Sequence, residues 1–196
     1  MVDLYADGSK LALAKDVANE NLAYGNPYDL NSASILNGNT KSVSFSANNG
    51  TSDNWHYIHF NLASSFKKGD VITISVIGNL TGSQSADGYF KTTVFSSDLS
   101  TCFDDNQEGN PLKSGGLCSK TIVFNADGDP NNPPILLLYA GLAGTTGGNT
   151  LSLKNIKVER GSIATPWIPS SNDIVMQSDV ASLQDQINQL KSKVGS

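Results

Sequence analysis

The chain has 196 residues, enough for one domain of ordinary size with an appendage and too few for two full domains. Only 16% of the residues are charged, while Asn, Ser, Thr and Gly together make up 75 of the 196 residues. Such a composition favours short strands joined by turns. The formal net charge is −5 and Arg160 is the single arginine, which argues against nucleic acid and against an anionic membrane surface as partners.

The first 18 residues contain several acidic side chains and no apolar stretch of the length that a signal peptide needs. We interpret residues 1–18 as a linker or a helix that precedes the main domain. The opening resembles the middle of a chain, so we expect the sequence to be a piece of a longer protein.

Strand patterns recur between residues 41 and 159, and helix patterns do not. Each segment is short, rich in β-branched and aromatic residues, and bounded by turn-forming clusters. The sequence therefore predicts an all-β fold, an antiparallel two-sheet sandwich over residues 19–169. The predicted strands are 41–47, 55–62, 71–77, 89–96, 119–125, 135–141 and 151–159.

The predicted strand WHYIHFNL offers the clearest candidate for a binding site. Because strand side chains alternate between faces, Trp55, Tyr57, His59 and Asn61 share one face, and His56 lies with the core residues on the other. Aromatic rings beside amide and imidazole groups suit a sugar, whose C–H face stacks on rings while its hydroxyls seek polar partners. We predict a carbohydrate-binding face here; the alternative is that the rings only cover the edge of the sandwich.

Two tyrosines on neighbouring predicted strands, Tyr89 and Tyr139, complete the candidate carbohydrate-binding set. Leu137 shares a strand face with Tyr139, so core packing explains Tyr139 equally well. We include both tyrosines in the predicted site as a hypothesis.

The sequence offers little for catalysis. His56 and His59 lie on opposite strand faces and cannot bind one metal together. The paired carboxylates Asp104 and Asp105 lie in a polar loop without an apolar pocket that would raise one pKa. No motif of a known nucleophile, phosphate loop or zinc site is present. We predict that the protein is not an enzyme and needs no cofactor.

Two polar loops raise the questions of a metal and of a disulfide. Asp127, Asp129 and Asn131 alternate as at the start of a calcium loop, but the glutamate that closes such a loop is absent. They are weak candidates for a structural calcium site, with ordinary turn chemistry as the alternative. Cys102 and Cys118 flank one polar loop, and both a disulfide and two free thiols are open.

The sequence pattern changes near the end of the chain. It predicts, within residues 170–196, an irregular segment that leads away from the sandwich (the exit strap) followed by a helix. Apolar residues there alternate at spacings of three and four, which is typical of a coiled-coil seam. About two and a half heptads are too few for a stable isolated coiled coil. We predict self-association, with dimers favoured by the packing residues; the alternative is a helix that packs back onto its own sandwich. The seam residues are Val180, Leu183, Ile187, Leu190 and Val194.

The two ends of the predicted sandwich, NENLAYGNPYDL and KNIKVERGSIATPWIPSSND, resemble the bracketing motifs of carbohydrate-binding modules in tail and baseplate proteins of phages that infect Gram-positive bacteria. The opening motif matches the first strand of that family, and the middle of the chain matches by strand pattern alone. The closing motif is carried by Glu159, Gly161, Ala164, Thr165, Pro166, Trp167 and Pro169.

This resemblance implies a jelly-roll sandwich that binds saccharide of the host cell wall, in a virion tail or baseplate beside other baseplate proteins. It implies that Trp167 is structural, and it favours a trimer slightly over a dimer. No catalytic role comes with it. Two alternatives stay open: a structural spacer that binds no sugar, and a carbohydrate-binding module of a bacterial cell-surface protein.

Overall fold

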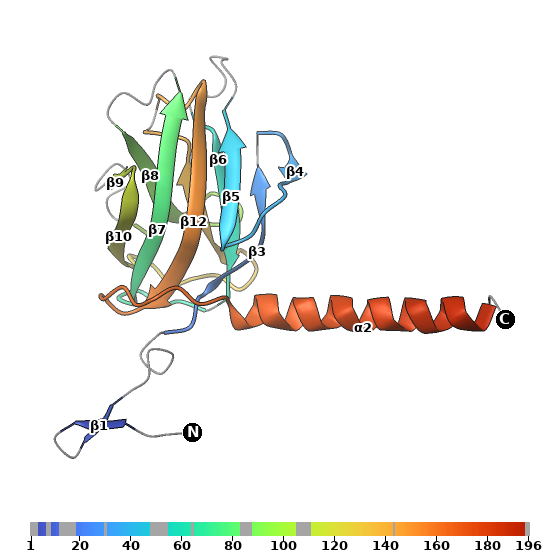
Figure 1. Cartoon of the computed structure of the whole chain (residues 1–196). Coiled ribbons are helices and arrows are strands. Elements are labelled where there is room, and N and C mark those ends of the chain that lie inside the picture. Colours follow the sequence, from blue (N-terminus) through green and yellow to red (C-terminus); the bar gives the residue numbers. More distant parts are fainter. Residues whose placement is uncertain are drawn as a thin grey trace.

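The chain folds into a β-sandwich from which a long helix projects (Figure 1). Two antiparallel sheets pack face to face, and all seven predicted segments contain a strand. The prediction of an all-β two-sheet sandwich is therefore confirmed. The computed structural model describes residues 4–6, 9–11, 19–29, 31–47, 55–63, 65–82, 88–104, 111–142 and 144–194.

The two sheets differ in size. The smaller has the order β10–β7–β12–β5, and these strands are Gly116–Val123, Val71–Gly82, Asn149–Arg160 and Ser42–Ser46. The larger has the order β4–β3–β6–β11–β8–β9, with bounds Ser34–Ile35, Ala23–Asp29, Tyr57–Leu62, Pro134–Tyr139, Tyr89–Ser96 and Leu112–Lys113.

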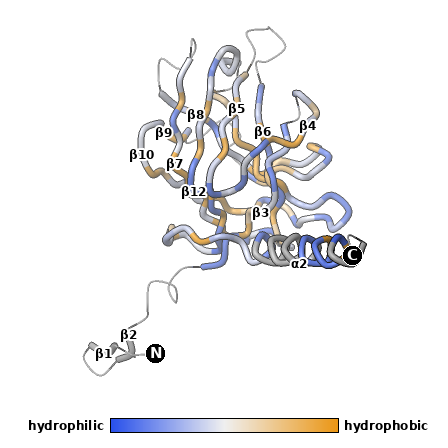
Figure 2. The backbone as a smooth tube through the Cα atoms, turned by 45° about the vertical axis from the view of Figure 1, so that its right-hand side comes forward, coloured by the Kyte–Doolittle hydropathy of each residue, from blue (hydrophilic) through white to orange (hydrophobic). Residues whose placement is uncertain are grey.

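The core lies between the sheets and follows from the alternation of each strand. In β6, Ile58 and Phe60 are fully buried, and in β7 so are Ile72 and Ile74. Burial of such side chains contributes about 1.5–3 kcal/mol each, which is the main force that holds the sheets together. Apolar and polar stretches accordingly alternate along the strands in Figure 2.

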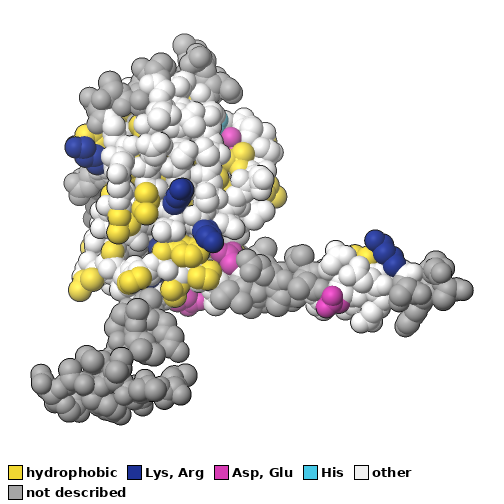
Figure 3. All heavy atoms as spheres, viewed as in Figure 1, with side chains coloured by type: hydrophobic (Ala, Val, Ile, Leu, Met, Phe, Trp, Pro, Cys, Tyr) yellow, Lys and Arg dark blue, Asp and Glu magenta, His cyan; other side chains and the backbone are white. Residues whose placement is uncertain are grey.

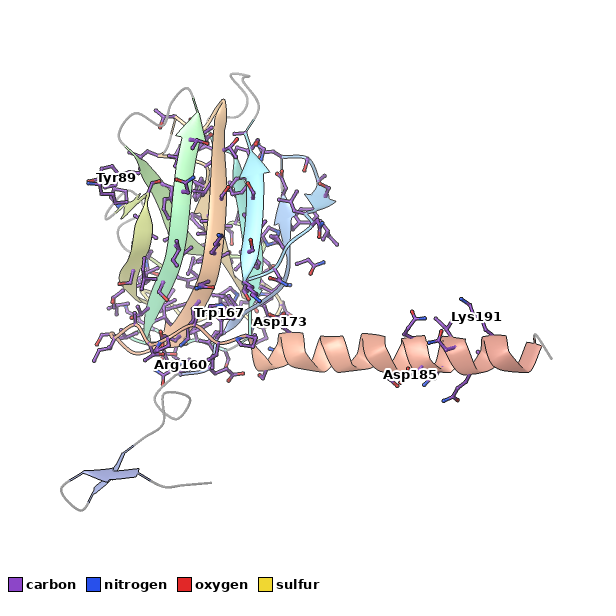
Figure 4. The ribbon with its side chains drawn as sticks, viewed as in Figure 1. Tyr89, Arg160, Trp167, Asp173, Asp185 and Lys191 are labelled. Atoms are coloured by element: carbon purple, nitrogen blue, oxygen red, sulfur yellow. The ribbon has the colours of Figure 1, made fainter. Side chains whose placement is uncertain are left out.

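After β12 the chain forms a strap that is fixed to the sandwich by buried polar groups. The Lys157 ammonium lies 3.2 Å from a Glu159 carboxylate oxygen, and both side chains are fully buried. Lys157 also donates to the Thr165 hydroxyl at 2.6 Å. Trp167, at the base of the sandwich in Figure 4, donates from Nε1 to the Ile156 carbonyl at 3.1 Å.

Helix α2 (Ser171–Val194) follows the strap and runs outward from the base of the sandwich (Figure 1). Its first turn is tied to β3, because the Gly25 N–H donates to the Asp173 carboxylate at 2.7 Å. The helix does not lie back on the sandwich, so that alternative from the sequence is wrong. Its described turns are mostly hydrophilic in Figure 2, and Asp185 and Lys191 point away from it into open space in Figure 4.

The predicted seam of α2 has no partner to pack against within one chain. Ile187 is 45% exposed and Leu190 is 62% exposed. The side chains of Val180, Leu183 and Val194 lie outside the described residues. A coiled coil needs a second chain, so this pairing stays a prediction. No helix in the described part of the chain is both long and apolar enough to cross a membrane.

The segment interpreted as a linker or helix, residues 1–18, contains two short strands. Leu4–Ala6 (β1) and Ser9–Leu11 (β2) pair antiparallel as a small hairpin. This hairpin shares no sheet with the sandwich.

The two cysteines are free thiols, which settles the question that the sequence left open. The Cys102 thiol points to the Asp104 carbonyl at 3.4 Å, whereas the Cys118 thiol points to the Val76 carbonyl on β7 at 3.2 Å. Burial raises the pKa of Cys118 to about 11, so this thiol stays protonated at neutral pH.

Candidate functional site

The outer face of the six-stranded sheet gathers the aromatic residues of the sandwich surface. Because the strands are in register, outward side chains form rows that run across β4, β3, β6, β11 and β8. We call this surface the aromatic face. Its rows are Trp55, Tyr57, Tyr139 and Lys91; Ile35, Tyr28, His59, Leu137 and Thr93; and Tyr24, Asn61, Ile135, Phe95 and Cys102.

The first row is a compact cluster of three rings and one cation. The ring centroids of Tyr57 and Tyr139 are 5.0 Å apart, and those of Trp55 and Tyr139 are 6.3 Å apart in an edge-to-face arrangement. The ammonium of Lys91 lies 5.6 Å from the centroid of Trp55 and 5.4 Å from that of Tyr139. The structure thus brings three of the predicted site residues together.

The side chains of this cluster differ in their exposure to solvent. Trp55 is 49% exposed, but Tyr57 and Tyr139 are only 8% and 5% exposed. They pack with Ile135 and Leu137 in a second apolar cluster outside the main core. Burial raises the pKa of both phenols, so both are neutral at neutral pH.

The second and third rows add hydrogen-bonding groups next to the rings. His59 lies against Tyr28, with ring centroids 5.2 Å apart, and its Nδ1 is buried without a hydrogen-bond partner. Burial lowers the pKa of His59, so the imidazole is neutral at neutral pH. Asn61 is exposed and stands opposite Tyr24 in the register. The second and third rows of the aromatic face therefore carry a neutral imidazole and an exposed amide on β6.

Tyr89 lies apart from the cluster. Lys91 pairs with Tyr139, the last residue of β11, so Tyr89 stands beyond the end of that strand, opposite Lys113 of β9. In Figure 4 it lies on the side of the sandwich away from α2. The structure thus places Tyr89 at the margin of the aromatic face.

The sequence reasoning did not include two tyrosines and a lysine of the aromatic face. Tyr24 and Tyr28 lie in β3, where Gly25 and Pro27 interrupt the pattern and the register shifts between the two tyrosines. Lys91 belongs to a strand with ordinary alternation, and only its contact with the rings distinguishes it. The repeated tyrosines of the opening motif were the available signal for β3.

The outer face of the four-stranded sheet has a different chemistry. Small hydroxyl side chains pair across its strands, as between Ser44 and Ser152 at 2.9 Å and between Ser46 and Thr150 at 2.7 Å. Figure 3 shows that most side chains over β7, β12 and β5 are neither charged nor hydrophobic. This surface offers no aromatic platform among its described residues, so the aromatic face is the better candidate site.

The acidic loop that was considered for calcium uses its oxygens in ordinary turn chemistry. Asp127 accepts a hydrogen bond from the Lys68 N–H at 2.8 Å, which holds the pKa of Asp127 low together with the Lys67 ammonium. Asp129 accepts from the Asn131 N–H at 2.9 Å. Among the described residues, no group of three or more His, Cys, Asp or Glu side chains is placed to hold a metal.

The side chains weighed for catalysis are engaged elsewhere. His56 is in the core, with Nε2 3.1 Å from the Asp29 carboxylate, on the face opposite His59 as predicted. The Asp104 carboxylate pairs with the buried Lys120 ammonium, and Asp105 lies outside the described residues.

Comparison with known proteins gives structural likeness without sequence likeness. No family model matches the chain, and no curated protein sequence matches it. The fold is similar to the N-terminal cellulose-binding domain of β-1,4-glucanase C from Cellulomonas fimi, with 12% identity, a TM-score of 0.45 and coverage of 71% of this chain and 90% of that one. Two point mutants of family 29 carbohydrate-binding modules are also similar, with 11% and 12% identity, TM-scores of 0.38, and coverage of 74% of this chain and 82% and 77% of those chains.

Proposed function

We propose that this chain is a non-catalytic saccharide-binding module and that the aromatic face is its binding site. The observation that carries the proposal is the arrangement of Trp55, which is half exposed, beside the buried rings of Tyr57 and Tyr139. In this proposal an oligosaccharide stacks one ring on the indole and extends along β6, where hydroxyls of its further sugar residues bond to the imidazole of His59 and the amide of Asn61. No motif of a known hydrolase or transferase accompanies this surface in the sequence.

The two bracketing motifs support a place in a phage tail or baseplate, where the module attaches the virion to host cell-wall saccharide. The jelly-roll topology and contacts with other baseplate proteins belong to the same proposal. Self-association through α2, as a trimer in preference to a dimer, would present several copies of the aromatic face to one cell wall. The same chemistry would serve a module on a bacterial cell surface.

The test is binding of the fluorescently labelled chain to Gram-positive cells and to polysaccharide purified from their walls. We expect saturable binding that Trp55→Ala abolishes, because the indole supplies the exposed stacking surface. The matched control is Leu117→Ala, which removes an apolar side chain 70% exposed on β10 of the other sheet. Circular dichroism of both variants checks that the sandwich is intact.

One observation favours a second candidate, a structural spacer that binds no sugar. Tyr57 and Tyr139 are buried by their own neighbours, as side chains that only stabilise the outer face would be. Absence of wild-type binding across a broad strain panel favours the spacer. If the Trp55→Ala variant still binds, the saccharide-binding function stands and the loops, not the indole, form the binding site.

A further inference from the structure

Lys91 stands out among the buried lysines of the sandwich. Lys120 and Lys157 are buried, and each ammonium is paired with a carboxylate, of Asp104 and Glu159 respectively. Lys91 is 7% exposed, and no hydrogen bond or ion pair of its ammonium is found within the described residues. A buried charge is costly unless it is paired, and attraction to ring faces compensates this cost only in part.

The surroundings of Lys91 on the aromatic face carry no negative charge at the described positions. The three rows contain phenols, an indole, an imidazole, an amide, a hydroxyl, a thiol and apolar side chains, but no carboxylate. Beyond the first row, the next charged side chain on this face is Lys113, another cation, opposite Tyr89. In a chain with a formal net charge of −5, the charged side chains found on the described part of this face, Lys91 and Lys113, are thus both cationic.

We propose that the aromatic face takes an acidic saccharide, whose carboxylate or phosphate oxygen pairs with the Lys91 ammonium while a sugar ring stacks on Trp55. This inference rests on the proposed function and names the class of its ligand. The Lys91 ammonium lies 5.6 Å from the Trp55 ring, so one sugar residue and its acidic substituent reach both groups. The ion pair between the Lys91 ammonium and the acidic group of the ligand would form in a partly desolvated site, where charge-assisted hydrogen bonds are strong.

The experiment compares acidic polysaccharides with their neutral counterparts. The probes are polygalacturonate against its methyl-esterified form, phosphomannan against mannan, and cell-wall polysaccharide before and after removal of its phosphate groups. The first pair tests a carboxylate and the other two test a phosphate. For at least one pair we expect the wild type to bind the acidic member tighter by about tenfold or more.

Four variants separate the role of charge from that of folding. Lys91→Gln should lose the preference for the acidic member, and Lys91→Arg should keep it. The matched control Lys154→Gln removes a cation from an exposed position on β12 and should change nothing. Thermal unfolding gives a second readout: Lys91→Met should leave the melting temperature unchanged or raise it, because an unpaired buried charge is removed.

The outcomes distinguish this inference from the proposed function. Wild type that binds acidic and neutral members alike overturns the acidic ligand and leaves saccharide binding in place. A Lys91→Gln variant that keeps the preference also overturns it, as does Lys91→Met that unfolds at a markedly lower temperature, which shows that the cation orders the rings. No binding of any probe by the wild type overturns both.

Discussion

His59 is the residue of the aromatic face that responds to pH in the neutral to mildly acidic range. Its imidazole is partly buried against Tyr28, and Nδ1 has no hydrogen-bond partner. Burial disfavours the charged ring, so the pKa of His59 lies below its ordinary value in the folded chain. The unfolded chain therefore binds a proton at this position more readily than the folded one.

This imbalance makes stability depend on pH. The pKa in the unfolded chain is about 6.5, so the cost of protonating His59 is absent above that pH and grows as the pH falls below it. We expect the wild type to lose more free energy of unfolding between pH 7.5 and 5.5 than His59→Gln does. Urea unfolding of both proteins at the two pH values measures the difference. Equal losses would contradict a buried, neutral His59, because His56 is common to both.

At the scale of strands, close packing between the sheets depends on one glycine of β7. A Cβ atom added at Gly78 would lie 2.4 Å from the ring of Phe90, and that ring is fully buried. Gly116 is the direct partner of Gly78 in β10, and a Cβ there meets nothing within 4 Å. Two neighbouring glycines of one sheet therefore have opposite tolerance for a methyl group.

We expect Gly78→Ala to lower the free energy of unfolding by about 1–3 kcal/mol, because Phe90 cannot move into solvent to make room. Gly116→Ala should stay within about 1 kcal/mol of the wild type, since it restricts the unfolded chain and strains nothing. Urea denaturation of the two variants gives both values. Similar losses in both would show that the methyl group harms the strands themselves and not the contact with Phe90.

The strands also show how far sequence reasoning reaches. Regular alternation gave the two-sheet sandwich and placed His56 and His59 on opposite faces, because strand geometry alone decides this. The pairing of strands that are distant in the sequence could not be predicted. No local pattern indicates that Lys91 pairs with Tyr139, or that β3 lies beside β6. The burial of Tyr57 could not be predicted for the same reason, since the residues that cover it belong to β11.

For the whole molecule, the projecting helix α2 is the element through which we predict self-association. It leaves the sandwich at its base, and Ile187 and Leu190 are exposed along it. Most of the stability of a helix comes from packing of its apolar face, and burial of the predicted seam of α2 against other copies would supply such packing.

We expect the wild type to sediment as a concentration-dependent oligomer and the double variant Ile187→Asp, Leu190→Asp to sediment as a monomer with an intact sandwich. Analytical ultracentrifugation over a range of concentrations makes this measurement. The control variant Gln186→Asp adds a charge outside the predicted seam and should leave association unchanged. A wild type that stays monomeric at high concentration would contradict a role of α2 in association.

The chain enters and leaves the sandwich at the same end. The Asn19 N–H donates to the Thr165 hydroxyl at 3.2 Å, and the Asn21 side chain bonds to the backbone of Ile156 and Val158. The Ser171 hydroxyl donates to Glu20 where α2 begins. Tension applied between the flanking segments would therefore pass through this small group of contacts and bypass most of both sheets. The sandwich would keep its shape under mechanical load until these contacts separate.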